Sequence, residues 1–140
     1  VLNSLEHYPI NKPLALLIKQ HCEAAIAKDN DVHVVASLRA LTQAPDEVVL
    51  KIVEPILHRA YLNAEMLILL AARHMRVLAD VDRAVLFLEK CALHDDAFFQ
   101  GLFADIVQVP QCRIYVLQAL HSDALSELCT TKLATLHSTR

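Results

Sequence analysis

Residues 95–122, DDAFFQGLFADIVQVPQCRIYVLQALHS, predict the basic unit of this fold. Asp95 is of a type that caps helix N-termini, and the apolar residues after it recur at helical spacing. Pro110 suits the first turn of a second helix, because an N–H at that position would have no intrahelical partner. The stretch also holds three of the four phenylalanines and the single glycine, Gly101. It therefore predicts two helices joined by a tight turn.

The same pattern occurs twice earlier in the chain. The cap candidates Asp31, Asn63 and Asp95 follow one another at intervals of 32 residues. A helix pair that recurs about every 30 to 40 residues is typical of α-solenoids. The three windows share these apolar positions: Val34, Met66 and Phe98; Val35, Leu67 and Phe99; Leu38, Leu70 and Leu102.

The predicted fold class is therefore all-α, with stacked antiparallel helical hairpins in a HEAT-like α-solenoid. An irregular multi-helix bundle is the alternative, because helices joined by short loops recur at about this interval in any case. No alternating pattern of period two predicts a strand.

Capping signals place further helices on either side of the repeated pattern. Asn11 is expected to cap a helix that runs to about Lys28. Asp80 or Asp82 is expected to open another helix, and Asp123 to cap the last one.

Some residues inside the predicted helices need a structural reason. Pro55 predicts a kink, or a helix that ends near Val53, because an interior proline removes a backbone hydrogen bond. Gly101 predicts a close approach of two helices, because glycine lowers helix stability. Asp105 lies near a helix C-terminus, where a carboxylate is unfavourable, and we expect it to pair with Arg113.

The composition indicates a single all-helical domain, residues 1–140. Hydrophobic residues make up 55% of the chain and the net charge is −3, with both signs intermixed. This charge distribution argues against nucleic-acid binding, because such binding needs a clustered basic face. The most apolar run, residues 66–72, is too short for a membrane span. The chain begins with Val1 instead of Met, which suggests the C-terminal part of a longer protein.

Four cysteines, Cys22, Cys91, Cys112 and Cys129, lie far apart in apolar helical patterns and form no C-x-x-C motif. We expect buried free thiols in a reducing compartment, the cytoplasm. Two disulfides are possible by count, but a core of this size does not need them.

No residue pattern identifies a catalytic, cofactor-binding or metal site, so none is predicted. The histidines form no H-x-x-x-H or H-E-x-x-H pair, and His94 and His121 fall at helix ends, where a protonated ring favours the dipole. Residues 91–96, CALHDD, would need two further ligands to hold zinc. A single glycine excludes glycine-rich phosphate loops.

A small basic group is the other candidate interaction feature. Arg73, His74 and Arg76 lie together, with Arg83 nearby. We expect a solvated helix end, and the alternative is a docking spot for an acidic partner.

The last third of the chain resembles the C-terminal region of an uncharacterised family of gammaproteobacterial proteins of a few hundred residues. The resemblance implies no activity, because that family has no assigned function. It is carried by a Phe-x-x-Leu-Phe-Ala-Asp-x-Val-x-x-Pro run, here Phe99, Leu102, Phe103, Ala104, Asp105, Val107 and Pro110.

The functional prediction is a protein–protein interaction or scaffold module that has no catalytic activity and no cofactor. Self-association as a homo-oligomer through an exposed apolar end is expected, because end helices of a stack need polar caps. The alternative is a nucleic-acid-binding helical repeat. An enzyme whose site lies between this domain and a missing one is the third reading.

Overall fold

The computed structural model describes residues 10–138, and in this range the chain is all-α, as predicted, with no strand. One short 3₁₀ helix, η2 (Met75–Leu78), joins two of the α-helices. The α-helices are α1 (Lys12–Ala27), α2 (Asp31–Ala40), α3 (Asp46–Leu57), α4 (Ala64–Arg73), α5 (Val81–Ala92), α6 (Asp96–Val107), α7 (Pro110–Ala119) and α8 (Glu127–Ser138).

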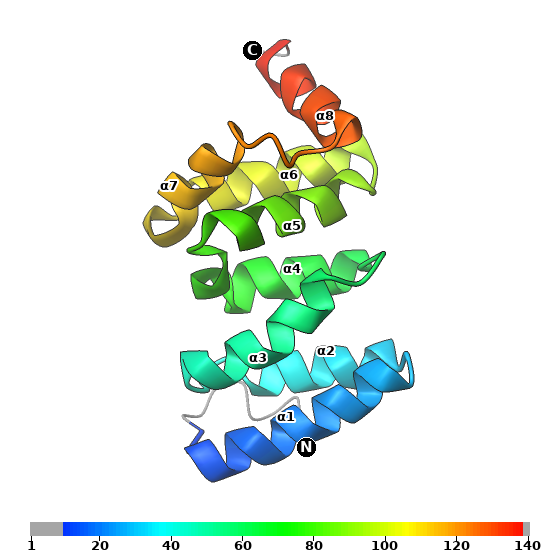
Figure 1. Cartoon of the computed structure of the whole chain (residues 1–140), viewed down its shortest axis with the longest axis vertical. Coiled ribbons are helices and arrows are strands. Elements are labelled where there is room, and N and C mark those ends of the chain that lie inside the picture. Colours follow the sequence, from blue (N-terminus) through cyan, green and yellow to red (C-terminus); the bar gives the residue numbers. More distant parts are fainter. Residues whose placement is uncertain (1–9, 139–140) are drawn as a thin grey trace.

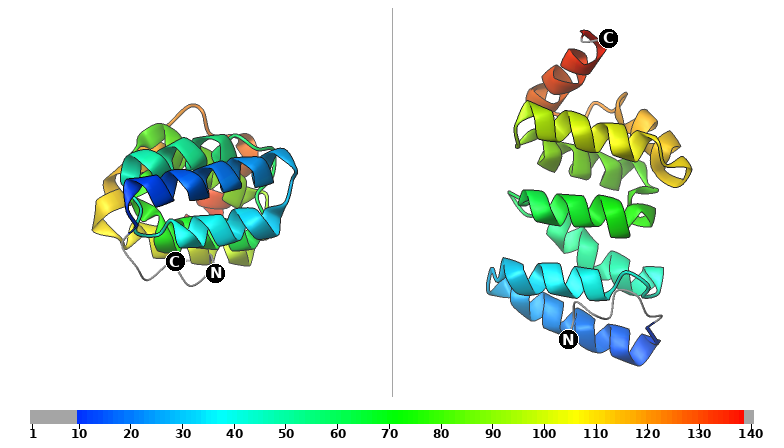
Figure 2. Two further views of the ribbon diagram at one scale, coloured as in Figure 1. Left: turned by 90° about the horizontal axis from the view of Figure 1, so that it is seen from below. Right: turned by 180° about the vertical axis from the view of Figure 1, so that it is seen from behind.

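The helices are stacked in chain order along the long axis of the molecule (Figures 1 and 2). Helix α1 packs on α2 and α3, α2 on α4, α3 on α5, and α5 on α7. Each helix therefore buries its apolar face against near neighbours in the sequence. The HEAT-like solenoid is a more specific description than these packings establish, and it stays a prediction. Within residues 10–138 no helix has the length and apolar character to cross a membrane.

One continuous apolar core runs through the stack. The repeated positions predicted for it are buried, with the exception of Phe98, which is only partly buried. Phe87 of α5 is also fully buried, although it is not one of the aligned positions. Leu93 follows the last residue of α5, Ala92, and is 48% exposed.

Side-chain caps begin most helices where the sequence predicts them. Asn11, Asn63, Asp80 and Asp95 each accept a hydrogen bond from a backbone N–H of the first turn. The prediction for Asp31 is wrong by one residue. Asn30 is the cap of α2 and accepts from His33 N at 3.3 Å, so the cap spacing is 33 and then 32 residues.

The predicted start of the last helix is also wrong. Helix α8 begins at Glu127, four residues after the expected cap Asp123. Ser126 is the residue that caps it, because its Oγ accepts from Cys129 N at 3.2 Å. The connection before it is irregular, with Ser122 Oγ accepting from Ala124 N.

The expected break at Pro55 does not occur. Helix α3 continues to Leu57, and His58 N still donates to Glu54 O at 3.3 Å. The proline lies in the last turn, so only its own N–H is missing from the ladder.

Gly101 and Asp105 both differ from the predictions. A methyl group added at Gly101 would meet nothing within 4 Å, so no neighbouring helix approaches it closely. Asp105 is exposed and forms no ion pair with Arg113, although the structure describes both residues. The side chains of Asp105 and Arg113 are both exposed.

Side chains of one layer bind backbone carbonyls of the layer before it. His74 Nε2 lies 2.6 Å from Leu38 O, a carbonyl near the C-terminus of α2. Arg76 donates to Thr42 O at 3.2 Å and to Ala44 O at 3.1 Å. The last carbonyls of a helix have no intrahelical partner, so such donors satisfy groups that would otherwise lose hydrogen bonds.

The same arrangement recurs at the C-terminal end of the stack. His94 Nε2 lies 2.7 Å from Leu62 O, and Lys132 Nζ donates in turn to His94 O. We call these contacts, together with those of His74 and Arg76, the carbonyl bridges.

The basic group is a solvated helix end only at Arg73, which is exposed in the last turn of α4. His74 is fully buried, Arg76 pairs with Asp46, and Arg83 donates to Val77 O at 2.6 Å and to Glu54 at 3.2 Å. The alternative prediction, a docking spot for an acidic partner, does not fit either, because these donors are used within the molecule.

Candidate functional site

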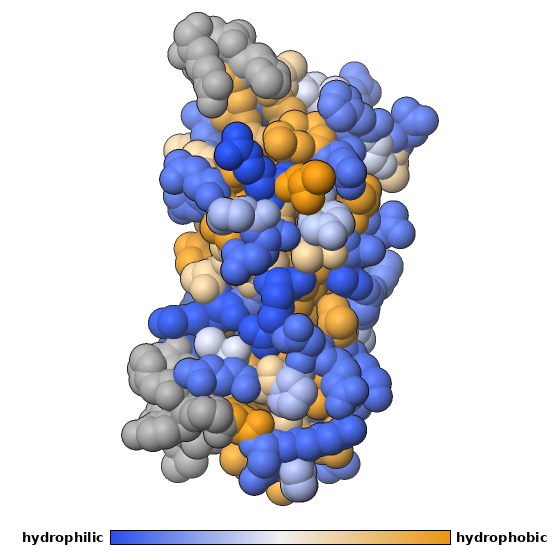
Figure 3. Space-filling view, turned by 90° about the vertical axis from the view of Figure 1, so that its left-hand side faces the viewer, coloured by the Kyte–Doolittle hydropathy of each residue, from blue (hydrophilic) through white to orange (hydrophobic). Residues whose placement is uncertain are grey.

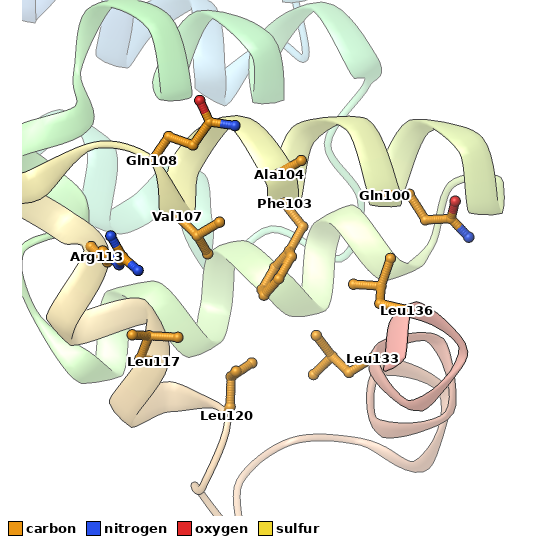
Figure 4. A pocket seen from close by; sticks show the side chains of 10 residues that line it. All are labelled: Gln100, Phe103, Ala104, Val107, Gln108, Arg113, Leu117, Leu120, Leu133 and Leu136. Atoms are coloured by element: carbon orange, nitrogen blue, oxygen red, sulfur yellow. The ribbon is translucent and has the colours of Figure 1, made fainter. Parts of the chain in front are cut away.

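An apolar groove lies at the C-terminal end of the stack, between α6, α7 and α8 (Figure 4). Its volume is about 510 Å³, within the range of sites that accept ligands or partner side chains. The groove is lined by Gln100, Phe103, Ala104, Val107, Gln108, Arg113, Leu117, Leu120, Leu133 and Leu136.

Helix α6 forms the floor of the groove because it is apolar on two faces. Phe99, Leu102 and Ile106 are buried against the core. Phe103 and Val107 are one turn apart on another face and point into the groove (Figure 4). The rings of Phe99 and Phe103 stack with centroids 6.1 Å apart, so the core and the groove floor are in direct contact.

The two walls of the groove come from α7 and α8. Leu117 of α7 is 41% exposed, and Leu120 follows at the end of the same helix. Leu133 and Leu136 of α8 face them from the other side (Figure 4). Leu133 is buried and Leu120 and Leu136 are partly buried, so the exposed Leu117 contributes the apolar wall surface that is most available to a partner.

Helix α8 is held in place by polar contacts as well as by its buried Cys129. It packs on α5 and α6. Lys132 pairs with Asp96 at 3.3 Å in addition to bridging to His94 O. Ser126 N donates to Glu89 at 2.6 Å, which fixes the start of the helix on α5.

The polar residues of the groove lie at its edges and are of few kinds. Gln100 and Gln108 come from α6, and Arg113 from the first turns of α7 (Figure 4). Among the residues whose side chains the structure describes, the lining contains no histidine, cysteine, serine or carboxylate. The polar groups of these residues are hydrogen-bond donors and acceptors, and none of them is a usual nucleophile or general base.

The four cysteines are free and buried, as predicted. Burial raises the pKa of the Cys22 thiol to about 11 and that of Cys129 to about 12. Burial also raises the pKa of Cys91 and of Cys112. The thiolate is the reactive form of cysteine, so these protonated thiols are poor nucleophiles at neutral pH.

The residues of the CALHDD segment have separate structural roles. Cys91 is buried in the core, and Asp95 accepts from Phe98 N at 2.8 Å as a helix cap. The His94 ring contacts the rings of Tyr61 and Phe98, with centroids 5.2 and 4.8 Å away. Over residues 10–138, no three His, Cys, Asp or Glu side chains gather in a way that could hold a metal ion.

The sequence did not predict the groove as a site. The one sequence signal for it is that residues 96–107 are apolar on more than one face of the helix. The residues that carry the family resemblance divide between the two roles: Phe99 and Leu102 pack in the core, whereas Phe103, Ala104 and Val107 line the groove.

The family model for a group of proteins of unknown function, DUF3549, matches residues 1–137, so the chain belongs to that family. The resemblance predicted an uncharacterised family, and this prediction is confirmed. Neither a curated protein nor a solved structure matches the chain.

Proposed function

We propose that this protein is a non-catalytic protein–protein interaction module, and that the groove between α6, α7 and α8 is its binding surface. The observation that carries the proposal is the groove itself, an apolar cavity of about 510 Å³ built from three helices. Apolar patches with polar rims commonly mark interaction sites, and partner side chains bind best in such pockets. On the side shown in Figure 3, apolar residues lie between hydrophilic ones towards the C-terminal end of the stack.

The chemistry of the titratable groups supports a role without catalysis. The described residues of the groove lining offer amides and one guanidinium as polar groups. The buried thiols are protonated at neutral pH, and the buried His74 is bonded to a backbone carbonyl. Free thiols also fit a reducing compartment, and we propose the cytoplasm.

The distribution of cations favours a protein partner over nucleic acid. Arg59 pairs with Asp29 and Asp31, Arg83 with Glu54, and Lys132 with Asp96. Cations that are neutralised inside the fold give no basic face for a phosphate backbone.

A site-specific cross-linking experiment tests the proposal. A photoreactive amino acid replaces Leu117 in the groove, and in a control protein it replaces Val32, which is 77% exposed on α2. Cross-linking is done in cells of the native source, and mass spectrometry identifies the products. We expect a discrete protein partner from position 117 and none from position 32.

The identified partner is then purified and titrated with the protein. Leu117→Glu should weaken the affinity by about thirtyfold or more, as for a residue at the centre of an interface. Val32→Glu is the matched surface control and should leave the affinity unchanged. Equal affinities of the two variants would contradict the assignment of the groove as the binding surface.

A further inference from the structure

The groove is asymmetric in charge. Its α7 side presents Arg113 beside Leu117, whereas the described lining residues on its α8 side are Leu133 and Leu136 (Figure 4). An occupant of the groove therefore meets a cation on one flank and apolar side chains on the other.

Arg113 is unusual among the arginines of residues 10–138, because its guanidinium has no partner within that part of the chain. Arg59, Arg76 and Arg83 each bind a carboxylate or a backbone carbonyl. The two further arginines, Arg39 and Arg73, also take part in interactions. Arg113 is exposed on α7 and lines the groove, so its donors are directed to solvent or to an occupant.

A guanidinium at the edge of an apolar groove is complementary to a carboxylate. Arginine binds a carboxylate through two parallel hydrogen bonds, which fix orientation as well as adding energy. The two glutamines at the groove edge bind neutral polar groups and do not compensate the charge.

The apolar surface between α7 and α8 fits the side chains of a helix. An amphipathic helix bound in a groove inserts apolar residues at positions i, i+3 or i+4, and i+7, and keeps its polar face in water. Phe103, Leu117, Leu120 and Leu133 surround the space that such anchors would enter (Figure 4).

We infer that the groove binds an amphipathic helix of a partner protein that carries an aspartate or glutamate on the flank facing Arg113. This inference rests on the proposed function and specifies the chemistry of the partner. The apolar anchors supply affinity, and the carboxylate determines the orientation of the helix and selects among partners.

The experiment is a selection from a displayed library of amphipathic helices of about 18 residues, or five turns. The apolar anchor positions are kept as Leu, Ile or Phe, and all flanking positions are randomised. Selection is done in parallel on the natural protein, on Arg113→Glu and on Leu117→Glu. Both positions are exposed on α7, so both variants should keep the fold, which circular dichroism checks.

Selection on the natural protein should enrich Asp or Glu on one flank, and selection on Arg113→Glu should enrich Lys or Arg at the same positions. Leu117→Glu should enrich no helix. A selected peptide and its Glu→Lys counterpart are then titrated by fluorescence anisotropy. The acidic peptide should bind the natural protein about fivefold more tightly, and Arg113→Glu should reverse this order, as expected for a rim ion pair.

Three outcomes would overturn the inference. If the enriched helices showed no charge preference, the inferred acidic residue of the partner would be wrong, whereas the groove would still be an interaction surface. No enrichment over an unrelated bait protein would exclude an amphipathic helix as the occupant, whereas the cross-linking experiment would still decide the proposed function. A dimer in light scattering that Leu117→Glu dissociates would identify a second copy of this chain as the occupant.

Discussion

Replacing His74 with glutamine is expected to make the fold less sensitive to acid. The ring is fully buried, its Nε2 donates to Leu38 O, and its Nδ1 has no partner within the described residues. Protonation would place an unpaired donor and a charge in the core, close to Arg76 and Arg73. A glutamine amide can still donate to Leu38 O but does not titrate.

The magnitude follows from the pKa of the ring. Burial lowers the pKa of His74 from 6.5 to about 4. Above about pH 6.5 the ring is neutral in the folded and the unfolded state, so it does not make stability depend on pH. Between the two pKa values only the unfolded chain binds the proton, so the free energy of unfolding falls as the pH falls. The loss attributable to His74 is about 2–3 kcal/mol at about pH 4.5.

Urea denaturation followed by circular dichroism measures this loss at about pH 7.5 and about pH 4.5. Carboxylates and other histidines also titrate, so the informative quantity is the difference between the natural protein and His74→Gln. The natural protein should lose about 2–3 kcal/mol more than the variant. His121→Gln, at an exposed position, is the control and should behave like the natural protein. Equal losses in the natural protein and His74→Gln would refute the reasoning.

Three further predictions concern the stack itself. Gly101→Ala should raise the free energy of unfolding by about 0.5–1 kcal/mol, because alanine favours the helix more than glycine does and the added methyl group meets no neighbour. A lower melting temperature of the variant would contradict this prediction. Arg76→Ala should cost about 1–3 kcal/mol in urea denaturation, because Thr42 O and Ala44 O lose a donor, whereas Arg113→Ala should stay within about 0.5 kcal/mol. The four thiols should react with a colorimetric thiol reagent only after denaturation, and rapid reaction in the native state would show that they are not buried.

The helices could be predicted because their signals are local. A cap such as Asn63 or Asp95 binds an N–H three residues away, and proline at the first turn acts on its own backbone. The same signals were wrong at Asp31 and Asp123, because a second capping residue nearby, Asn30 or Ser126, was also available. Local chemistry does not decide between adjacent candidates of equal capping strength.

The carbonyl bridges and the groove could not be predicted in this way. His74 lies 36 residues along the chain from Leu38, whose carbonyl accepts its hydrogen bond, and Arg76 lies 34 residues from Thr42. Their partners depend on how one layer is placed on the next, which periodicity does not specify. The two apolar faces of α6 predicted burial correctly for Phe99, but only the position of α8 shows that Phe103 lies beside open space.

The carbonyl bridges also bear on how the chain folds and opens. Each one joins residues 32 to 38 positions apart, so a layer needs only its predecessor to be formed. When each layer contacts mainly its neighbours in the stack, segments of the chain can open separately in hydrogen exchange. At the C-terminal end, α8 is followed by no further helix within the described residues, so its amides should exchange ahead of those of α5. Helix α8, one wall of the groove, should then open before α5, and a bound partner should slow the exchange of α8 most.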